Sequence, residues 1–236
     1  MITLANIKID NVTLWESLQK LEEFIVSGKP HLIVTPNPEM IVAAQTDKEL
    51  FDILNGADLR LPDGISMVVV SRIKKVPLKE RVTGIDFLLS SCRLAAEKGW
   101  RVFLLGGTEL SVSMASQNLK RQFPALNIAG IHDGYFDNDD EILSRIKESK
   151  SDIIFAGLGA GKQEKWLCKN LDKLGVKVAV GVGGSFDVIS GIKKRAPKWV
   201  QKLYIEWLYR LITEPYRIKR QVALPNFLYL TLIKYH

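Results

Sequence analysis

Short apolar runs alternate with longer stretches of mixed polarity along the first 192 residues of this 236-residue chain. An apolar run that ends at a glycine or a polar turn is typical of a buried strand, and apolar residues three or four apart are typical of a helix. The predicted strands are Leu32–Thr35, Arg101–Leu105, Ile128–Ile131, Asp152–Ala156 and Val176–Val182. The first predicted helix starts after Pro38 and runs through Met40–Ala44. The others run from Thr108-Glu109 to about Phe123, from about Asp139 to Ser149 and over Lys162–Lys173.

This order predicts an α/β fold, a Rossmann-like and mostly parallel sheet with helices on both faces, followed by a C-terminal helical appendage. Ligands of such sheets bind at the carboxyl ends of the strands, so the residues directly after each strand are the first candidates for a site. These turns are Thr35–Glu39, Leu61–Gly64, Gly106–Thr108, Gly157–Gln163 and Gly183–Asp187.

The pattern changes after Ala196-Pro197, where a proline suits the first turn of a helix. Pro215 is expected to end this helix, and Pro225 is expected to break the chain before the apolar end FLYLTLI. Apolar side chains recur along one helical face at Val200, Leu203, Tyr204, Trp207, Leu208 and Leu211. We therefore predict two units, an α/β core over residues 1–195 and an appendage of amphipathic helices over residues 196–236.

The excess positive charge lies in the appendage and the three residues directly before it. Residues 193–236 contain ten Lys or Arg against two Glu, whereas the rest of the chain has 23 basic and 24 acidic residues. Tyr and Trp residues lie among these cations, so three interpretations stay open: a helix on an anionic membrane surface, a helix packed on the protein body, and a site for single-stranded nucleic acid. The apolar stripe favours the first two.

No apolar run reaches the roughly 18 residues that a membrane-crossing helix needs, and the N-terminus lacks the basic start and apolar core of a signal peptide. Cys92 and Cys168 lie in predicted helices without metal-ligand spacing. We expect both to be buried, reduced thiols in a cytosolic protein.

The glycine-rich turns suit a phosphate because backbone N–H groups can approach an anion there. Gly107, Gly159, Lys162 and Gly184 are the candidates for nucleotide or substrate binding, although a tight strand-to-helix turn explains the same glycines. An NAD-type site is not favoured. It requires an acidic residue about 20 positions on, at the end of a second strand, and Asp172 comes too early and within a helix.

The carboxylates that offer chemistry each have a structural alternative. Asp63, in a Pro-Asp-Gly turn, is either a turn residue or a general base at the rim of a pocket. Asp187 either accepts a hydrogen bond from a sugar or ribose hydroxyl or caps a helix. The cluster Asp137–Asp140 has the Asp-x-Asp form seen in metal-dependent sugar transferases, but its place before a helix indicates an N-cap. Since the three histidines are scattered as well, we predict no metal site.

Five blocks of this sequence, in order and over nearly its whole length, resemble the WecG/TagA/CpsF family of bacterial glycosyltransferases. The last is the most specific. The blocks are Thr35-Pro-Asn-Pro-Glu-Met40, Leu61-Pro-Asp-Gly64, Glu80-Arg-Val-Thr-Gly84, Gly157-Leu-Gly-Ala-Gly-Lys-Gln-Glu-Lys-Trp166 and Gly181–Arg220.

The resemblance implies inverting, metal-independent transfer of N-acetylmannosamine from UDP to a polyprenyl-diphosphate-linked N-acetylglucosamine, for teichoic acid or another surface polysaccharide. It implies that Asp63 is the catalytic base, with Tyr135 and Asp187 near the nucleotide. It implies no cofactor. The polar residues matched in the same pocket are Thr35, Asn37, Arg81 and Gln163.

The resemblance also implies that the appendage closes over the pocket and brings Arg210, Arg217 and Arg220 to the diphosphate. The partners are then a UDP-sugar, the lipid-linked acceptor and an anionic membrane surface, without nucleic acid. The protein would be cytoplasmic and peripheral on the inner face of the membrane, and a homo-oligomer is an open alternative. Two rival functions are transfer from another UDP-hexose and a non-catalytic role as a nucleic-acid-binding module.

Two positions depart from the family's pattern. Gly161 stands where proline is usual, which we expect to loosen the start of the following helix. Tyr204 stands where glycine is usual, which we expect to alter the packing of the appendage.

Overall fold

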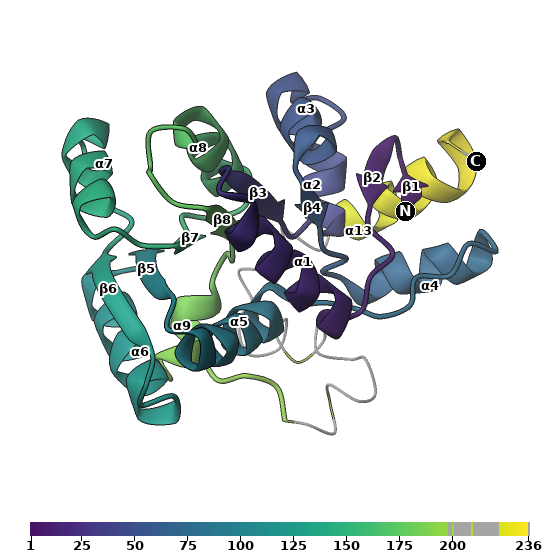
Figure 1. Cartoon of the computed structure of the whole chain (residues 1–236). Coiled ribbons are helices and arrows are strands. Elements are labelled where there is room, and N and C mark those ends of the chain that lie inside the picture. The colour runs from purple at the N-terminus through teal and green to yellow at the C-terminus, as the bar shows by residue number, and fades with distance from the viewer. Residues whose placement is uncertain (198–199, 201–208, 210–221, 236) are drawn as a thin grey trace.

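The computed structural model describes residues 1–197, 200, 209 and 222–235, and Figure 1 shows the arrangement of their elements. Its centre is a six-stranded sheet in which every neighbouring pair is parallel, in the order β4-β3-β8-β7-β5-β6. The strands are β3 (His31–Val34), β4 (Leu59–Arg60), β5 (Arg101–Gly106), β6 (Asn127–His132), β7 (Ile153–Gly157) and β8 (Val178–Gly181). The five predicted strands are thus confirmed, and β4 ends directly before the predicted turn Leu61–Gly64.

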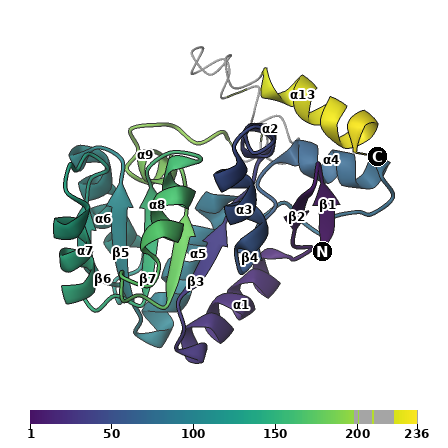
Figure 2. The same ribbon diagram turned by 90° about the horizontal axis from the view of Figure 1, so that it is seen from above.

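Helices cover both faces of the sheet, which confirms the predicted α/β fold (Figure 2). Successive strand residues point to opposite faces, so β7 contributes Ile154 and Ala156 to one core and Ile153 and Phe155 to the other. The helices on the first core are α2 (Pro38–Ala43), α3 (Lys48–Gly56), α4 (Ile65–Ile73), α7 (Asp139–Glu148) and α8 (Lys162–Asn170). Those on the second are α1 (Leu14–Ser27), α5 (Gly84–Lys98), α6 (Glu109–Gln122) and α9 (Ser185–Ile189).

The first nine residues form an antiparallel hairpin, β1 (Ile2–Leu4) and β2 (Ile7–Ile9), that the hydrophobic pattern did not lead us to predict. Its alternate apolar side chains join the first core. The two turn residues, Ala5 and Asn6, have φ of 46° and 63°, a conformation that alanine rarely adopts. The usual glycine signal of such a turn is therefore missing from the sequence.

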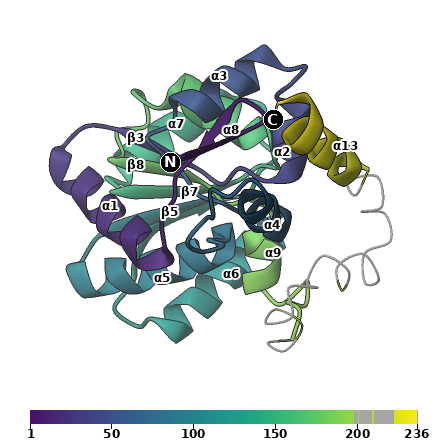
Figure 3. The same cartoon turned by 90° about the vertical axis from the view of Figure 1, so that its right-hand side faces the viewer.

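The chain ends in α13 (Ala223–Tyr229), continued by a π-helical turn, η2 (Leu230–Lys234). The α13 helix lies along α2 (Figure 3), and Phe227 is fully buried in the first core. Pro225 does not break the chain, contrary to the prediction, because it is the third residue of α13, where a missing N–H leaves no helical bond unmade.

Most of the predicted amphipathic stripe, including Leu203, Trp207 and Leu211, lies outside the described residues. The division into units 1–195 and 196–236 therefore stays a prediction. Among the described residues, no helix has both the length and the apolar character that crossing a membrane requires.

Candidate active site

The turns after β3, β4, β7 and β8 meet at one edge of the sheet. This edge collects the carboxyl ends of the parallel strands, and β8 lies between β3 and β7. The hydroxyl of Thr35 donates to the carbonyl oxygen of Gly181 at 3.1 Å, and the N–H of Gly183 donates to Oε1 of Gln163 at 3.0 Å. The structure thus brings together turns that are up to about 150 residues apart in the chain.

Asp63 joins three segments at this edge. Its backbone N–H donates to the carbonyl oxygen of Pro36 at 3.1 Å, which joins the turn after β4 to the turn after β3. Its carboxylate accepts the N–H of Gly84, the first residue of α5, at 3.2 Å. The N-terminus of a helix favours negative charge, so this contact stabilises the ionised carboxylate that a general base requires.

Thr35 and Asn37 flank Pro36 on the same turn. Thr35 is buried, and its hydroxyl is engaged by Gly181. Asn37 is the N-cap of α2, where its Oδ1 accepts the N–H of Met40 at 3.0 Å. Since the amide oxygen is committed to the helix, the NH₂ group is the part of this side chain that can meet a substrate.

Gln163 is buried, and both ends of its amide are held. Its Oε1 accepts from Gly183, and its Nε2 donates to Oε1 of Glu164 at 2.7 Å. The other carboxylate oxygen of Glu164 accepts the N–H of Gly161 at 2.7 Å. Burial raises the pKa of Glu164, while these hydrogen bonds act in the opposite direction. Sequence reasoning did not single out Glu164, although it stands in one of the quoted blocks.

The turn before α8 depends on Gly161 being glycine. Its φ is 82°, whereas proline is fixed near −65°. Its N–H is also the donor to Glu164, and proline has none. The expected loosening of the helix start is not what the structure shows: this chain closes the turn with a backbone hydrogen bond to a buried carboxylate.

Different structural features explain why glycine occupies each of the candidate positions at the strand ends. A Cβ on Gly106 would stand 2.4 Å from the carbonyl oxygen of Gly157, and one on Gly107 would stand 3.2 Å from the hydroxyl of Ser111, so close packing explains both. Gly159 has a φ of 95°, so its backbone explains it. Gly184 has neither a positive φ nor an atom within 4 Å of a Cβ. The fold itself therefore does not require a glycine at 184.

Asp187 is engaged on both oxygens. Ser111 donates to Oδ1 at 2.8 Å and Lys193 to Oδ2 at 2.5 Å, so Asp187 ties α9 to α6 and to the chain leading into the appendage. Tyr135, in the loop after β6, is 80% exposed at the same edge of the sheet. An exposed ring there has no role in the core.

The segment that carries Arg81 runs next to the turn that carries Asp63, since the N–H of Val82 donates to the carbonyl oxygen of Pro62 at 3.1 Å. The other matched arginines, Arg210, Arg217 and Arg220, lie outside the described residues.

The chain leading to the appendage is anchored near this site. Arg195 donates to Oδ1 of Asp86 at 2.6 Å, and Thr83, the N-cap of α5, donates to Oδ2 at 2.6 Å. Sequence reasoning missed this ion pair because its members are 109 positions apart.

The acidic cluster before α7 is an N-cap, as predicted. Oδ1 of Asn138 accepts the N–H of Asp140 at 3.0 Å. Asp139 accepts the indole N–H of Trp166 at 2.8 Å, and this bond is the main reason that its pKa is lowered. Within the described ranges, no group of three or more His, Cys, Asp and Glu side chains could hold a metal ion.

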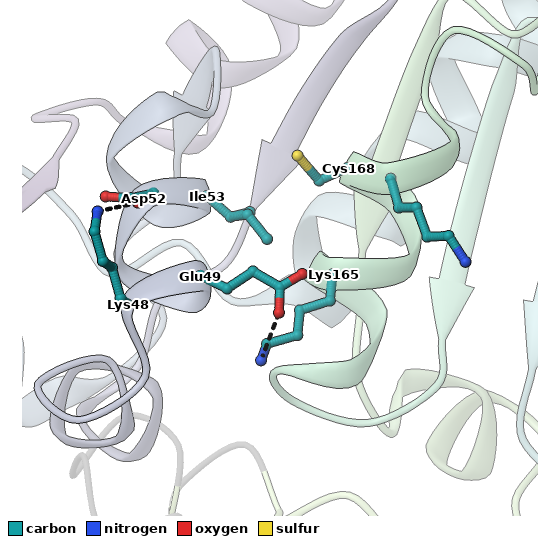
Figure 4. A pocket seen from close by; sticks show the side chains of 7 residues that line it. Lys48, Glu49, Asp52, Ile53, Lys165 and Cys168 are labelled. Atoms are coloured by element: carbon teal, nitrogen blue, oxygen red, sulfur yellow. Dashed lines mark hydrogen bonds and ion pairs between the residues drawn. The ribbon is translucent and has the colours of Figure 1, made fainter.

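A depression of about 460 Å³ lies between α3 and α8 (Figure 4). Lys165 forms ion pairs with Asp47 and Glu49 at its floor, and Cys168 lies at its edge. Cys168 is exposed, so the prediction that both thiols are buried is wrong for it and right for Cys92.

No predicted site residue lines this depression. A smaller cavity of about 310 Å³ adjoins it and is lined in part by Gly161 and by Lys162, the exposed first residue of α8. These two cavities therefore lie beside the cluster around Asp63.

The doubly covered parallel sheet, with polar side chains from four loops gathered at the carboxyl ends of its strands, defines a Rossmann-like α/β protein. Proteins of this class bind their ligands at that edge. A family model described as "Glycosyl transferase WecG/TagA/CpsF family" matches residues 2–236. The chain belongs to this family.

Three curated relatives bear the name N-acetylglucosaminyldiphosphoundecaprenol N-acetyl-beta-D-mannosaminyltransferase. The protein of Bacillus subtilis (strain 168) is 35% identical over 233 residues, 98% of this chain and 91% of the relative. That of Bacillus spizizenii (strain ATCC 23059 / NRRL B-14472 / W23) is 38% identical over 204 residues, 86% and 79% of the two chains. That of Staphylococcus aureus (strain NCTC 8325 / PS 47) is 35% identical over 231 residues, 97% and 91%.

Proposed function

We propose that this protein transfers N-acetylmannosamine from UDP to the N-acetylglucosamine of a diphosphoundecaprenol-linked acceptor, with inversion and without a metal ion. The names of the relatives supply the sugar and the acceptor. Inversion, metal independence and the UDP donor rest on the family resemblance. The product would serve teichoic acid or another surface polysaccharide.

In the proposed reaction the carboxylate of Asp63 takes the proton of the acceptor hydroxyl as that oxygen attacks the anomeric carbon. The bond from the anomeric carbon to the UDP oxygen breaks in the same displacement, and UDP leaves with its growing negative charge. Thr35, Asn37, Arg81 and Gln163 are the proposed polar contacts of the sugar donor. Arginines of the appendage, Arg210, Arg217 and Arg220, are the proposed partners of the diphosphate because guanidinium groups match phosphate geometry.

The observation that carries this proposal is the position of Asp63. Its backbone joins the turns after β3 and β4, and its carboxylate faces the N-terminus of α5. A base must be held where substrates enter and be able to take a proton, and this favours Asp63 over Asp187 and Glu164. Asp187 has both oxygens engaged, and Glu164 is fully buried.

Replacing Asp63 by Asn should lower kcat by on the order of a hundredfold or more, because the amide cannot take the proton. UDP binding, measured by calorimetry, should stay within about threefold of the wild type, since the amide keeps the shape of the turn. Turnover close to that of the wild type would remove Asp63 from its proposed role. Asp187→Asn is unsuitable as a control, and the exposed Asp52→Asn serves instead.

A different UDP-hexose is the second candidate donor, because the contacts described around Asp63 do not distinguish an axial from an equatorial acetamido group. A panel of UDP-sugars at equal concentration, compared by kcat/KM, separates these donors, and the same assay with a chelator tests metal independence. Family membership favours either of these over a non-catalytic nucleic-acid-binding module.

The nucleotide contacts are the proposed roles of Gly107, Tyr135, Gly159, Lys162, Gly184 and Asp187. Gly184 has the clearest support, since neither backbone strain nor packing requires glycine there and close approach of a phosphate would. Because the acceptor is lipid-linked, we place the protein on the cytoplasmic face of the membrane as a peripheral enzyme.

A further inference from the structure

The α4 helix leaves an apolar stripe uncovered. Met67, Val68 and Val70 are buried in the first core, while Val69 and Ile73 are exposed on the opposite side. Ile73 has 59% of its surface exposed. Positions four apart lie on one face of a helix, so these two side chains form one strip, and the exposed Val76 follows directly after the helix.

The C-terminal helix repeats the arrangement. Phe227 and Leu230 are buried, whereas Val222, Tyr229 and Ile233 are exposed on the other side. Ile233 has 69% of its surface exposed. Val222, Tyr229 and Ile233 follow one another at spacings of seven and four residues, so they lie on one face of the helix.

The two elements are neighbours. The ammonium group of Lys74, at the end of α4, donates to the carbonyl oxygens of Thr231 and Tyr235 at 3.1 and 2.9 Å. Both elements contribute to the same core, and all three views show them side by side (Figures 1–3).

The charge of these segments has one sign. Residues 64–79 and 222–235 contain five Lys or Arg and no Asp or Glu. Arg72, Lys75 and Lys234 are exposed among the apolar side chains. Exposed aliphatic and aromatic side chains bordered by cations match the boundary of an anionic bilayer, where the former enter the headgroup layer and the latter meet its phosphates.

Both elements are connected to the candidate site. The α4 helix begins two residues after Asp63, and α13 packs on α2, whose N-cap is Asn37. At a rise of about 1.5 Å per residue, Val69 and Ile73 lie roughly 6 and 12 Å along the axis from Ile65. An acceptor whose sugar is joined to its lipid by a single diphosphate needs the bilayer within such a distance of the base.

We propose that the exposed stripes of α4 and of the C-terminal helix, with Arg72, Lys75 and Lys234, form a docking surface for an anionic lipid bilayer. The C-terminal helix belongs to the predicted appendage of residues 196–236, whereas α4 belongs to the α/β core. The proposed surface thus extends the membrane contact expected of the appendage onto a helix of the core. The proposal rests on the proposed function in one respect, the expectation that the bilayer lies near Asp63.

The test is co-sedimentation of the full chain with vesicles of phosphatidylethanolamine and phosphatidylglycerol, without substrate. Ile73→Glu and Ile233→Glu should each lower the partition coefficient by about fivefold or more, because each removes an apolar contact and adds a charge that anionic lipid repels. Val26→Glu is the matched control. It is an exposed aliphatic residue in the last turn of α1, which leads to the opposite edge of the sheet, and it should leave binding unchanged.

Binding of both variants at the wild-type level would overturn the proposal, provided that thermal unfolding shows them folded. Loss of a dimer in analytical ultracentrifugation with unchanged vesicle binding would also overturn it, because the surface would then hold a second copy of the chain. Transfer to a water-soluble acceptor of short chain length should be unaffected by either variant. A failure of transfer in the wild type would instead count against the proposed function and leave the vesicle result standing.

Discussion

Glu164 is the residue on which the geometry of the candidate site depends most directly. It is fully buried and has no cation as a partner among its described contacts. Its two oxygens accept from the backbone of Gly161 and from the amide of Gln163, and that amide in turn accepts from Gly183. Because a carboxylate accepts only, it fixes which end of the Gln163 amide is the oxygen. Glu164 is therefore a positioning residue for Gln163.

Glu164→Gln should remove a pH dependence of stability. Burial raises the folded-state pKa of this carboxyl above its unfolded value. Its contribution to the free energy of unfolding is therefore fully present below the unfolded pKa and is lost as pH rises through the folded pKa. The difference between wild type and variant should fall by up to about 1 kcal/mol per pH unit across that window and be flat above it. Chemical denaturation at a series of pH values measures this.

Glu141→Gln is the control, because Glu141 occupies the same third position of α7 but is exposed. A wild-type curve parallel to that of Glu164→Gln would contradict the raised pKa. The positioning role predicts, in addition, that kcat of Glu164→Gln falls more than its KM rises.

A substitution of Gly181, at the end of β8, tests the packing of the same cluster. A Cβ there would stand 2.7 Å from Nε2 of Gln163 and 2.8 Å from Oε1 of Glu164. Gly181→Ala should therefore displace Gln163, lower kcat by about tenfold and destabilise the fold by about 1 to 3 kcal/mol. Gly56→Ala, where a Cβ meets nothing within 4 Å, should be neutral or slightly stabilising in the same assays. Equal effects of the two changes would exclude this account.

The sequence predicted the members of this cluster unevenly, for physical reasons. Asp63 and Gln163 could be proposed because they follow strand ends and match a family pattern. The closed turn at Gly161 could not, because a positive φ and a bond to a buried carboxylate depend on the three-dimensional position of Glu164.

Elements with strong local signals were predicted well. The β5 and β7 strands are apolar runs that end in glycine, and α6 begins after Thr108, which caps it as expected. The α1 helix was missed although Thr13 and Glu16 form a capping box and Gly28 ends it. That signal was readable from the sequence. The short strands of the N-terminal hairpin carry too few residues to show a period.

Lys74 fastens the C-terminal helix to α4, and its removal should loosen that element without unfolding the core. Lys74→Met removes two charge-assisted hydrogen bonds to carbonyl oxygens and should destabilise the fold by about 1 kcal/mol. Amide hydrogen exchange should become faster over residues 223–234 and stay unchanged in β7. Lys75→Met, at the exposed neighbouring position, should leave exchange as it is. The same exchange pattern in both variants would rule out the fastening role.

At the scale of the whole molecule, the strand order is what the sequence could not supply. The last strand, β8, is inserted between β3 and β7, and this insertion places Gly181 and Gly183 beside Thr35 and Gln163. Local pattern identifies a strand but not its neighbours in the sheet. The site could thus be predicted as a set of residues at one edge, but not as a set of contacts.

The C-terminal helix has a consequence for any test of the appendage. Its Phe227 fills the first core against α2, so a chain cut near residue 196 would lose core packing together with any lid. Phe227→Ala alone should destabilise the fold by about 3 to 5 kcal/mol through the cavity it leaves. It should also lower kcat, because α2 carries Asn37.

Thermal and chemical unfolding of Phe227→Ala measure this, with Tyr229→Ala as the matched control, an exposed aromatic residue on the same helix. The control should lose less than about 1 kcal/mol. If Phe227→Ala were as stable as the wild type, the C-terminal helix would not be part of the core, and truncation would become a fair test of the lid. Under the packing seen here, the proposed lid is better tested by replacing Arg210, Arg217 and Arg220 singly in a chain that keeps its last helix.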